Sequence, residues 1–238
     1  MSSSILKILA CIFMLIDHIG FCLLPGLPIL RIIGRLAFPI FAFQIAVGFK
    51  HTSNRKKYFL RMLIFALVSQ IPFFIFRDVA GYSGIALNIG FTFVLSIISL
   101  YFVELAKKKN ILFALLTIPV LILASYLNVD YKWYGIAVVI TFYLFDLKSA
   151  FGFVSSFILL LALSLVHVYT SNASAIQLYS LFALILLIFY NNKKGYDLRY
   201  LFYAFYPVHL LILSLIKYIM WKFSFILCFF HKEDIFFY

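Results

Sequence analysis

The chain has 238 residues, of which 66% are hydrophobic and 12% are charged. Soluble domains carry about 25% charged residues, so this composition excludes an ordinary soluble enzyme and indicates an integral membrane protein. The formal net charge is +12, but the basic residues are divided among helix ends instead of forming one stripe, which argues against nucleic-acid binding.

Nine apolar segments follow one another along the chain, most of them long enough to cross a hydrocarbon core of about 30 Å. In chain order they span residues 5–24, 29–49, 58–76, 86–106, 111–127, 133–146, 151–169, 176–190 and 200–220. We therefore expect an all-α, polytopic helix bundle with about nine transmembrane helices, forming one domain over residues 1–220. We expect residues 221–238 to lie along the membrane interface or to prolong the ninth helix.

The basic residues predict the orientation of these helices. With the N-terminus in the cytoplasm, 13 of the 20 basic residues fall on the inward side: Lys7, Lys50, Arg55, Lys56, Lys57, Arg61, Lys107, Lys108, Lys109, Lys148, Lys193, Lys194 and Arg199. Among the outward connections, Arg77 and Lys132 remain. Because positive charge accumulates on cytoplasmic loops, the sequence predicts a multi-pass protein of the cytoplasmic membrane, surrounded by the lipid bilayer, with its N-terminus inside.

Asp17 and His18 stand side by side within the first apolar segment. Placing ionisable side chains inside a membrane costs free energy, so the pair is interpreted as a functional site. An aspartate can orient a histidine, which is how a general base is built. Adjacent residues on a helix point about 100° apart, so a second arrangement is equally compatible, in which Asp17 pairs with Arg35 and His18 with His209.

Other polar residues are predicted to reach the same depth, toward the outer side. Arg31 and Arg35 are four residues apart and share a helix face, near Asp17. Arg31 can alternatively extend to the interface, and His209 can serve helix packing. Further candidates for an outward-facing polar cavity are Gln70, Asn88, Thr92, Asp130 and Tyr134. His167, near an outer helix end, is expected at the interface.

The three cysteines, Cys11, Cys22 and Cys228, lie in apolar surroundings. Their odd number and their spacing do not match a disulfide framework or a zinc site. The sequence also contains nothing that resembles a phosphate loop or a dinucleotide-binding fingerprint, so we expect neither a metal nor a tightly bound cofactor.

Several motifs carry a resemblance to a known family. They are residues 14–20 (MLIDHIG), 31–43 (RIIGRLAFPIFAF), 54–58 (NRKKY), 69–73 (SQIPF) and 205–210 (FYPVHL), together with Leu87, Asn88, Thr92, Asp130, Tyr131, Tyr134 and Gly135. With these motifs the chain resembles the TraX family, named for a conjugal-transfer membrane protein that N-acetylates pilin. Lys132 departs from the pattern, because a small residue is expected there.

The resemblance implies a membrane-embedded O- or N-acetyltransferase. Acetyl-CoA from the cytoplasm would be the donor, and an extracytoplasmic protein N-terminus, such as that of pilin, or a surface polysaccharide would be the acceptor. His18 is then the general base or a transient acetyl carrier, and Asp17 fixes its position or compensates its charge. Arg31 or Arg35 stabilises the oxyanion of the tetrahedral intermediate. The polar candidates above would contact substrate. The CoA phosphates would be held by Arg55, Lys56, Lys57 and Arg61.

Two other classes of function compete with this hypothesis. The first is a proton-coupled transporter, in which Asp17, His18 and Arg35 relay protons; the absence of visible repeats in the sequence counts against it. The second is a non-catalytic membrane protein that assists assembly of a surface structure. Substitution of His18 separates the acetyltransferase from the scaffold, because acetyl transfer requires its imidazole and a scaffold does not. Proton coupling measured in liposomes would identify the transporter.

Overall fold

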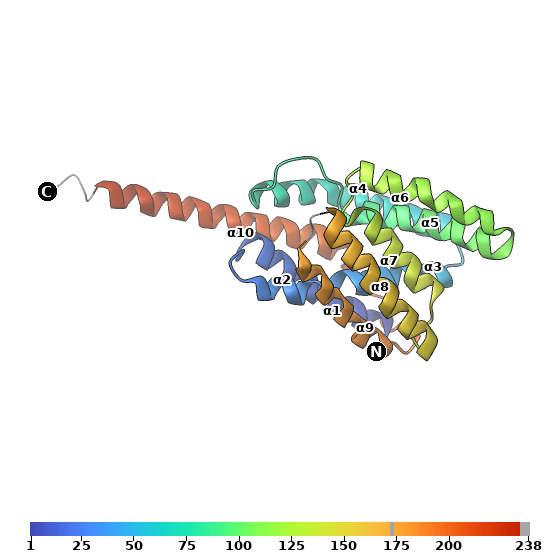
Figure 1. Ribbon diagram of the computed structural model, residues 1–238. Helices are drawn as coiled ribbons and strands as arrows, with labels where there is room; N and C mark the ends of the chain where they lie inside the picture. The colour runs from blue at the N-terminus through green and yellow to red at the C-terminus, as the bar shows by residue number, and fades with distance from the viewer. Residues whose placement is uncertain (172–173, 234–238) are drawn as a thin grey trace.

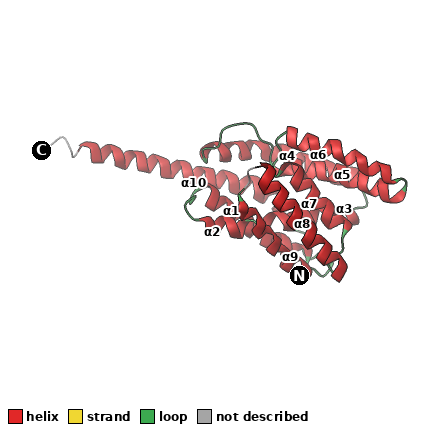
Figure 2. Cartoon of the chain, in the orientation of Figure 1, coloured by secondary structure: helices red, strands yellow, loops and turns green. Residues whose placement is uncertain are grey.

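The computed structural model describes residues 1–171 and 174–233, and this part of the chain is an all-helical bundle (Figures 1 and 2). Its α-helices are α1 (Ser3–Cys22), α2 (Pro28–Gly34), α3 (Ala37–His51), α4 (Arg55–Val79), α5 (Ile89–Lys108), α6 (Thr117–Tyr126), α7 (Lys132–Leu144), α8 (Ala150–Ser171), α9 (Ala183–Ile188) and α10 (Arg199–Glu233). Two 3₁₀ segments, η1 (Ile111–Leu116) and η2 (Ala175–Phe182), lead directly into α6 and α9.

All nine apolar segments predicted from the sequence are helical, but they differ in length. Within the described residues, six helical segments are long and apolar enough to cross a membrane, which supports a multi-pass membrane protein. The other three, Ile111–Tyr126, Lys132–Leu144 and Ala175–Ile188, have 10–17 residues. A 3₁₀ turn rises about 2.0 Å per residue, so η1 with α6 reaches about 27 Å in all. The count of nine spans therefore remains a prediction.

The second predicted helix is broken at Arg35. The backbone N–H of Arg35 bonds to the carbonyls of Arg31, at 3.1 Å, and Ile32, at 3.2 Å, which tightens the end of α2 before α3 begins. The break places Arg35 at a joint, between the short outer piece α2 and the longer helix α3. Pro28–His51 and Ile89–Lys108 are the most buried of the long segments, so α3 and α5 lie inside the bundle.

The start of the chain is fastened to the connection between α9 and α10. The backbone N–H groups of Ser3 and Ser4 donate to the carbonyls of Lys193 and Lys194, at 2.8 and 3.2 Å. The terminal ammonium contacts the carbonyl of Phe189. These bonds fix the first turn of α1 and bring Ser3 next to α3, where its hydroxyl donates to Gln44.

The longest helix, α10, has 35 residues and measures about 52 Å. It packs along α1 and α4 and then projects beyond the rest of the bundle (Figure 1). Residues up to Glu233 thus continue the last helix, and residues 234–238 lie outside the described residues.

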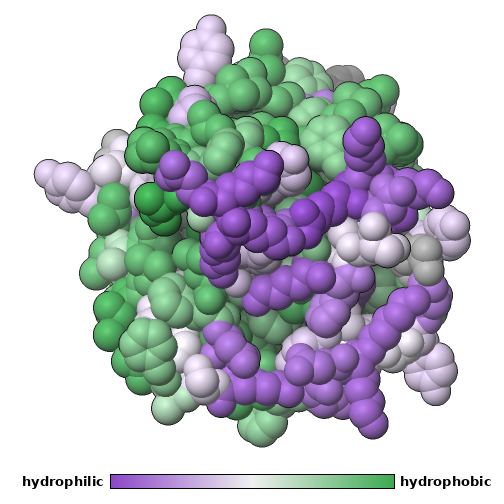
Figure 3. All heavy atoms as spheres, turned by 90° about the vertical axis from the view of Figure 1, so that its right-hand side faces the viewer, coloured by the Kyte–Doolittle hydropathy of each residue, from purple (hydrophilic) through white to green (hydrophobic). Residues whose placement is uncertain are grey.

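Hydrophilic side chains gather on the face at the right-hand side of Figure 1, as Figure 3 shows. The connection between α5 and η1 lies at this side, and the exposed lysines Lys107, Lys108 and Lys109 are in and next to it. Such a basic face is what the positive-inside rule requires of a cytoplasmic surface. The orientation itself remains a prediction.

Candidate functional site

A cavity of about 610 Å³ runs through the bundle, and we call it the central cavity. One end is lined by Lys7, Gln44, Gly48 and Tyr58, which we call the Lys7 compartment. The other end is lined by residues that include Arg77, Lys132, Ser171 and Ser174. Between the ends the wall is largely aromatic, with phenylalanines 21, 38, 73, 76 and 93, and carries a few ionisable side chains. Apolar walls with a few convergent polar groups are typical of ligand-binding sites.

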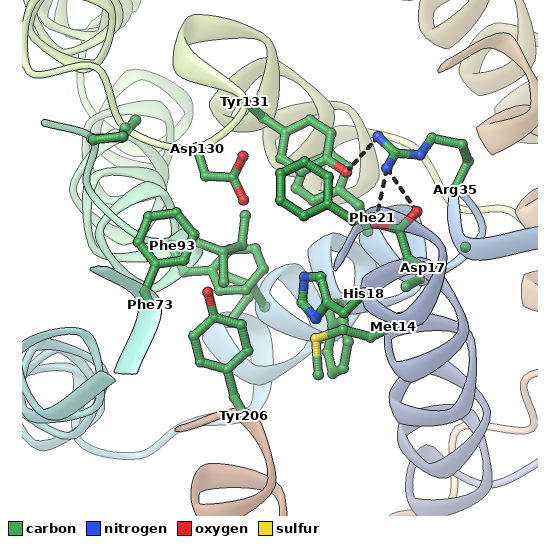
Figure 4. Close-up of a pocket in the computed structure, with 18 of the residues that line it drawn as sticks. Met14, Asp17, His18, Phe21, Arg35, Phe73, Phe93, Asp130, Tyr131 and Tyr206 are labelled. Atoms are coloured by element: carbon green, nitrogen blue, oxygen red, sulfur yellow. Dashed lines mark hydrogen bonds and ion pairs between the residues drawn. The ribbon is translucent and has the colours of Figure 1, made fainter. Parts of the chain in front are cut away.

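Asp17 binds two arginines in the wall of this cavity, Arg31 and Arg35, and Figure 4 shows its contact with Arg35. Arg35 Nη2 lies 2.7 Å from Oδ1 and 2.9 Å from Oδ2 of the carboxylate, and Arg31 Nη1 lies 2.5 Å from Oδ2. The salt bridge between Asp17 and Arg35 that the sequence predicts is thus present, and Arg31 joins it instead of extending to the interface alone. The three side chains are 13–26% exposed, so each charge depends on the others for its solvation.

The arginine pair lies close to Asp17 because α1 and α2 meet at Gly34. A Cβ atom at position 34 would collide with the Cβ and Oδ1 atoms of Asp17. We expect Gly34→Ala to lower the free energy of unfolding by about 1–3 kcal/mol, the usual range for overpacking. Gly26→Ala, in the turn between the same helices with no atom within 4 Å of the added Cβ, is the control. Equal stability of the two variants in detergent titrations would contradict this close contact.

His18 forms its hydrogen bond with His209 of α10 and not with Asp17. His18 Nδ1 lies 2.7 Å from His209 Nε2, and His209 Nδ1 lies 2.7 Å from the carbonyl oxygen of Phe205. A carbonyl only accepts, so His209 Nδ1 carries a hydrogen. In the neutral pair, His209 Nε2 then accepts from His18 Nδ1–H, and the lone pair of His18 Nε2 is left as the basic site. This is the second of the two arrangements compatible with the sequence.

Asp130 brings a second carboxyl group to the cavity, from the connection between α6 and α7. It points into the cavity from the side opposite His18, and Tyr206 approaches from α10 (Figure 4). A bridge between Leu87 and Val129 anchors the connection, and Asp130 N–H donates to the carbonyl of Leu87 at 2.9 Å. Burial raises the pKa of Asp130 to about 6, an effect that the Arg35 charge opposes.

The raised pKa of Asp130 predicts a pH-dependent stability. Between pH 4 and pH 6 the folded protein holds a proton at Asp130 that the unfolded chain has lost, so stability falls as the pH rises through this window and then levels off. The change amounts to at most about 3 kcal/mol. Unfolding titrations from pH 4 to pH 7 should show this decline in the wild type, and Asp130→Asn should flatten it. The same decline in both proteins would assign it to other groups.

The backbone that presents Asp130 adopts uncommon conformations. Asn128, Tyr131 and Lys132 have positive φ angles of 50°, 60° and 47°. Such conformations are unfavourable for residues with a side chain and collect at functional sites, where the surrounding structure holds them in place. Lys132 lines the cavity at this end.

Four residues that line the cavity were not among the predicted site residues: Tyr131, His167, Gln177 and Tyr206, although Tyr131 and Tyr206 lie in the motifs that carry the family resemblance. Arg35 Nη1 donates to Gln177 Oε1 at 3.3 Å and to the Tyr131 hydroxyl at 3.4 Å. His167 is 7% exposed and stacks on Tyr134 with ring centroids 4.6 Å apart, so its side chain faces the bundle, and its expected depth at the membrane interface remains a prediction. The signal that could have identified Gln177 is a polar amide at the start of the eighth apolar segment.

Of the residues predicted to contact substrate, Arg31 and Asp130 line the central cavity and four others do not. Asn88 Nδ2 donates to Gln70 Oε1 at 2.8 Å, and Gln70 Nε2 donates to the Ala86 carbonyl at 2.9 Å, so these two amides join the start of α5 to α4. Thr92 bonds to the carbonyl of Asp130, behind the wall.

Tyr134 also lies behind the cavity wall. Its hydroxyl is 3.0 Å from Ser164 Oγ and accepts from Gln177 Nε2 at 3.3 Å. The polar atoms of all four residues form hydrogen bonds within the helix bundle, so polarity in the sequence does not place them in the cavity. Their placement gives Gln70, Asn88, Thr92 and Tyr134 a supporting position and no direct access to a ligand in the cavity.

The four residues predicted to hold CoA phosphates also lie away from the central cavity. Arg55 forms an ion pair with Glu104, Arg61 stacks over Tyr58 at 5.9 Å, and Lys56 and Lys57 are exposed at the start of α4. Glu104 also binds Lys108 at 2.7 Å. The cluster therefore forms part of the hydrophilic surface. Its position outside the wall of the central cavity does not support a role in binding the donor there.

Cys11 and Cys22 are buried free thiols, and Cys228 lies beyond the side chains that the structure describes. Among the described residues, no group of three histidine, cysteine, aspartate or glutamate side chains is arranged to hold a metal ion.

The comparisons with known proteins place the chain in a family. It is 28% identical to the probable fimbrial assembly protein FimC of serogroup H1 from Dichelobacter nodosus, over 89% of this chain and 94% of that protein. A segment of 67 residues, 28% of this chain and 25% of the other, is 43% identical to the uncharacterized protein RP591 of Rickettsia prowazekii (strain Madrid E). No solved structure matches. The TraX protein family model matches residues 2–217, and the chain therefore belongs to the TraX family.

Proposed function

We propose that this protein is a membrane acetyltransferase of the cytoplasmic membrane, which moves an acetyl group from acetyl-CoA to an acceptor outside the cytoplasm. The observation that carries the proposal is the hydrogen-bonded series from the Phe205 carbonyl through His209 to His18. It leaves a basic imidazole nitrogen in a cavity whose wall also carries two arginines. A positioned base and a cationic group are the two elements that acyl transfer needs.

In this mechanism His18 Nε2 removes the proton from the acceptor amine or hydroxyl as that group attacks the acetyl carbonyl. The new bond to the acetyl carbon produces a tetrahedral oxyanion, and Arg31 stabilises it. Arg31 suits this role better than Arg35, because Arg35 already bonds to Asp17, Tyr131, Gln177 and the Arg31 carbonyl. The oxyanion then collapses, the carbon–sulfur bond breaks, and the proton held by His18 passes to the CoA thiolate.

The relative and the predicted topology support two classes of acceptor. The Dichelobacter protein is named for fimbrial assembly, so the N-terminus of a pilin-like subunit is one acceptor, and a surface polysaccharide is the other. A cavity that reaches both ends of the bundle suits either acceptor. The donor can enter at the end formed by the Lys7 compartment, and the acceptor can enter at the end formed by Arg77 and Lys132.

The experiment that tests the proposal is donor turnover in lipid nanodiscs. Purified protein is incubated with radiolabelled acetyl-CoA and a set of acceptors, consisting of peptides with free N-termini and surface polysaccharides. We expect CoA release together with transfer of the label to one acceptor class. Absence of both CoA release and label transfer with every acceptor would overturn the proposal.

A second candidate is a proton-coupled transporter, favoured by the extension of the central cavity between two ends of the bundle. In that case Asp17, His18 and Arg35 relay protons, and a substrate gradient would collapse with the proton gradient in liposomes. A non-catalytic role in fimbrial assembly predicts neither proton coupling nor CoA release.

A further inference from the structure

The central cavity extends well away from the candidate base. Lys7 precedes His18 by eleven residues of the same helix, so the Lys7 compartment lies about 16 Å from His18 along α1. Its wall is built from α1, α3, α4 and α10, and the compartment is continuous with the space around His18. A ligand whose reacting end lies at His18 therefore has room for a chain of this length.

Gln44 contributes an amide group of which the oxygen is hydrogen-bonded and the nitrogen is not. The residue is 7% exposed and lines the cavity. The Ser3 hydroxyl donates to its Oε1 atom at 2.6 Å, whereas its Nε2 atom has no hydrogen-bond partner among the described residues. A buried donor without an acceptor is costly, and its two hydrogens are satisfied when a ligand places a carbonyl oxygen there.

The rest of the compartment suits a slender chain that ends in negative charge. A Cβ atom at Gly48 would approach the Tyr58 hydroxyl to 2.8 Å, so glycine leaves that side of the wall open. Lys7 is partly exposed, lies over the ring of Phe202 at 5.6 Å and adds a positive charge at the far end. Ile45, Met62 and Phe202 supply apolar wall.

We propose that the Lys7 compartment binds the extended, amide-bearing arm of an acyl thioester donor, and this inference rests on the proposed function. Gln44 Nε2 donates to an amide carbonyl of the arm, Lys7 attracts the phosphates that follow it, and the thioester lies at His18. The donor is thus recognised inside the bundle and not by Arg55, Lys56, Lys57 and Arg61 on the surface.

The test is equilibrium binding to the full chain in nanodiscs, with a non-hydrolysable thioether analogue of acetyl-CoA as the probe. Gln44→Glu keeps the size of the side chain and the acceptor for Ser3 but removes the amide donor, so we expect binding about tenfold weaker or worse. Gln44→Leu should weaken binding similarly. The matched control is the double variant Lys56→Gln/Lys57→Gln, which should bind like the wild type. Unfolding titrations of all variants confirm that the bundle is intact.

A shorter probe separates the two contacts. The corresponding analogue of acetyl-pantetheine has the amide-bearing arm but no phosphates, so Gln44→Glu should weaken its binding while Lys7→Gln should not. With the full-length analogue, both substitutions should weaken binding.

Two results would overturn the inference in distinguishable ways. If the folded Gln44 variants bind like the wild type, or if the Lys56/Lys57 variant loses binding instead, the donor is held elsewhere and the proposed function stands. If the wild type binds neither analogue, the inference and the proposed acetyl-CoA donor fail together.

Discussion

Substitution of His18 by alanine is expected to lower the rate of acetyl transfer by about 10²–10⁴-fold, the usual contribution of a general base. The variant removes the nitrogen that receives the acceptor proton and leaves His209 without its partner at 2.7 Å. The measurement is CoA release from acetyl-CoA in nanodiscs at saturating acceptor. Because the imidazole faces a cavity, the helix bundle should remain folded.

The matched control for this prediction is His51→Ala, at the exposed end of α3. We expect its rate to equal that of the wild type. His209→Gln offers a finer test, because it retains a polar side chain but removes the nitrogen that accepts from His18. Its rate should fall by less than that of His18→Ala. Full activity of folded His18→Ala would refute the assigned role of the base.

Replacement of Asp17 by asparagine is expected to lower the free energy of unfolding by about 3–5 kcal/mol, because two guanidinium groups lose their shared counter-charge in a low-dielectric setting. Arg31 and Arg35 both bind this carboxylate. The loss should appear in detergent unfolding titrations and should exceed that of any single arginine substitution to a neutral residue of similar size, since each of those leaves one pair in place.

Asp197→Asn is the control for the loss of a carboxylate. Asp197 pairs with Lys194 on the surface at 3.2 Å, and its side chain is 44% exposed. An exposed ion pair contributes about 0–1 kcal/mol, so this variant should unfold like the wild type. If Asp17→Asn lowers the free energy of unfolding as little as Asp197→Asn, water in the cavity solvates the two arginines. Their stability then does not depend on the Asp17 carboxylate.

Apart from the end of α10, which runs to Glu233 instead of residue 220, the outer bounds of the apolar helical segments were predictable from the sequence to within a few residues, because a membrane requires continuous apolar helical segments. The break at Arg35 was not, since the polar joint between α2 and α3 lies within a run of otherwise regular hydropathy. The lengths of the three shorter segments agree with the predicted ranges, but the 3₁₀ turns η1 and η2 that begin two of them were not predictable from hydropathy.

The candidate site was predictable where charge was its signal. Asp17, His18 and Arg35 are conspicuous in an apolar chain, and the cost of burying them required them to pair. The partner of His18 could be named only as an alternative, because the contact depends on how α10 packs against α1. Gln70 and Asn88 show the opposite case, since neutral amides at helix ends give the same sequence signal whether they bind substrate or each other.

The measurement that addresses the proposed function most directly follows labelled acetate in cells. Cells that carry the wild-type gene, a deletion or His18→Ala are supplied with deuterated acetate, and acetyl label is measured by mass spectrometry on exported proteins and surface polymers. We expect label on at least one extracytoplasmic acceptor with the wild type, and its loss in both other strains. Identical labelling in all three, with the His18→Ala protein present in the membrane, would contradict an acetyltransferase.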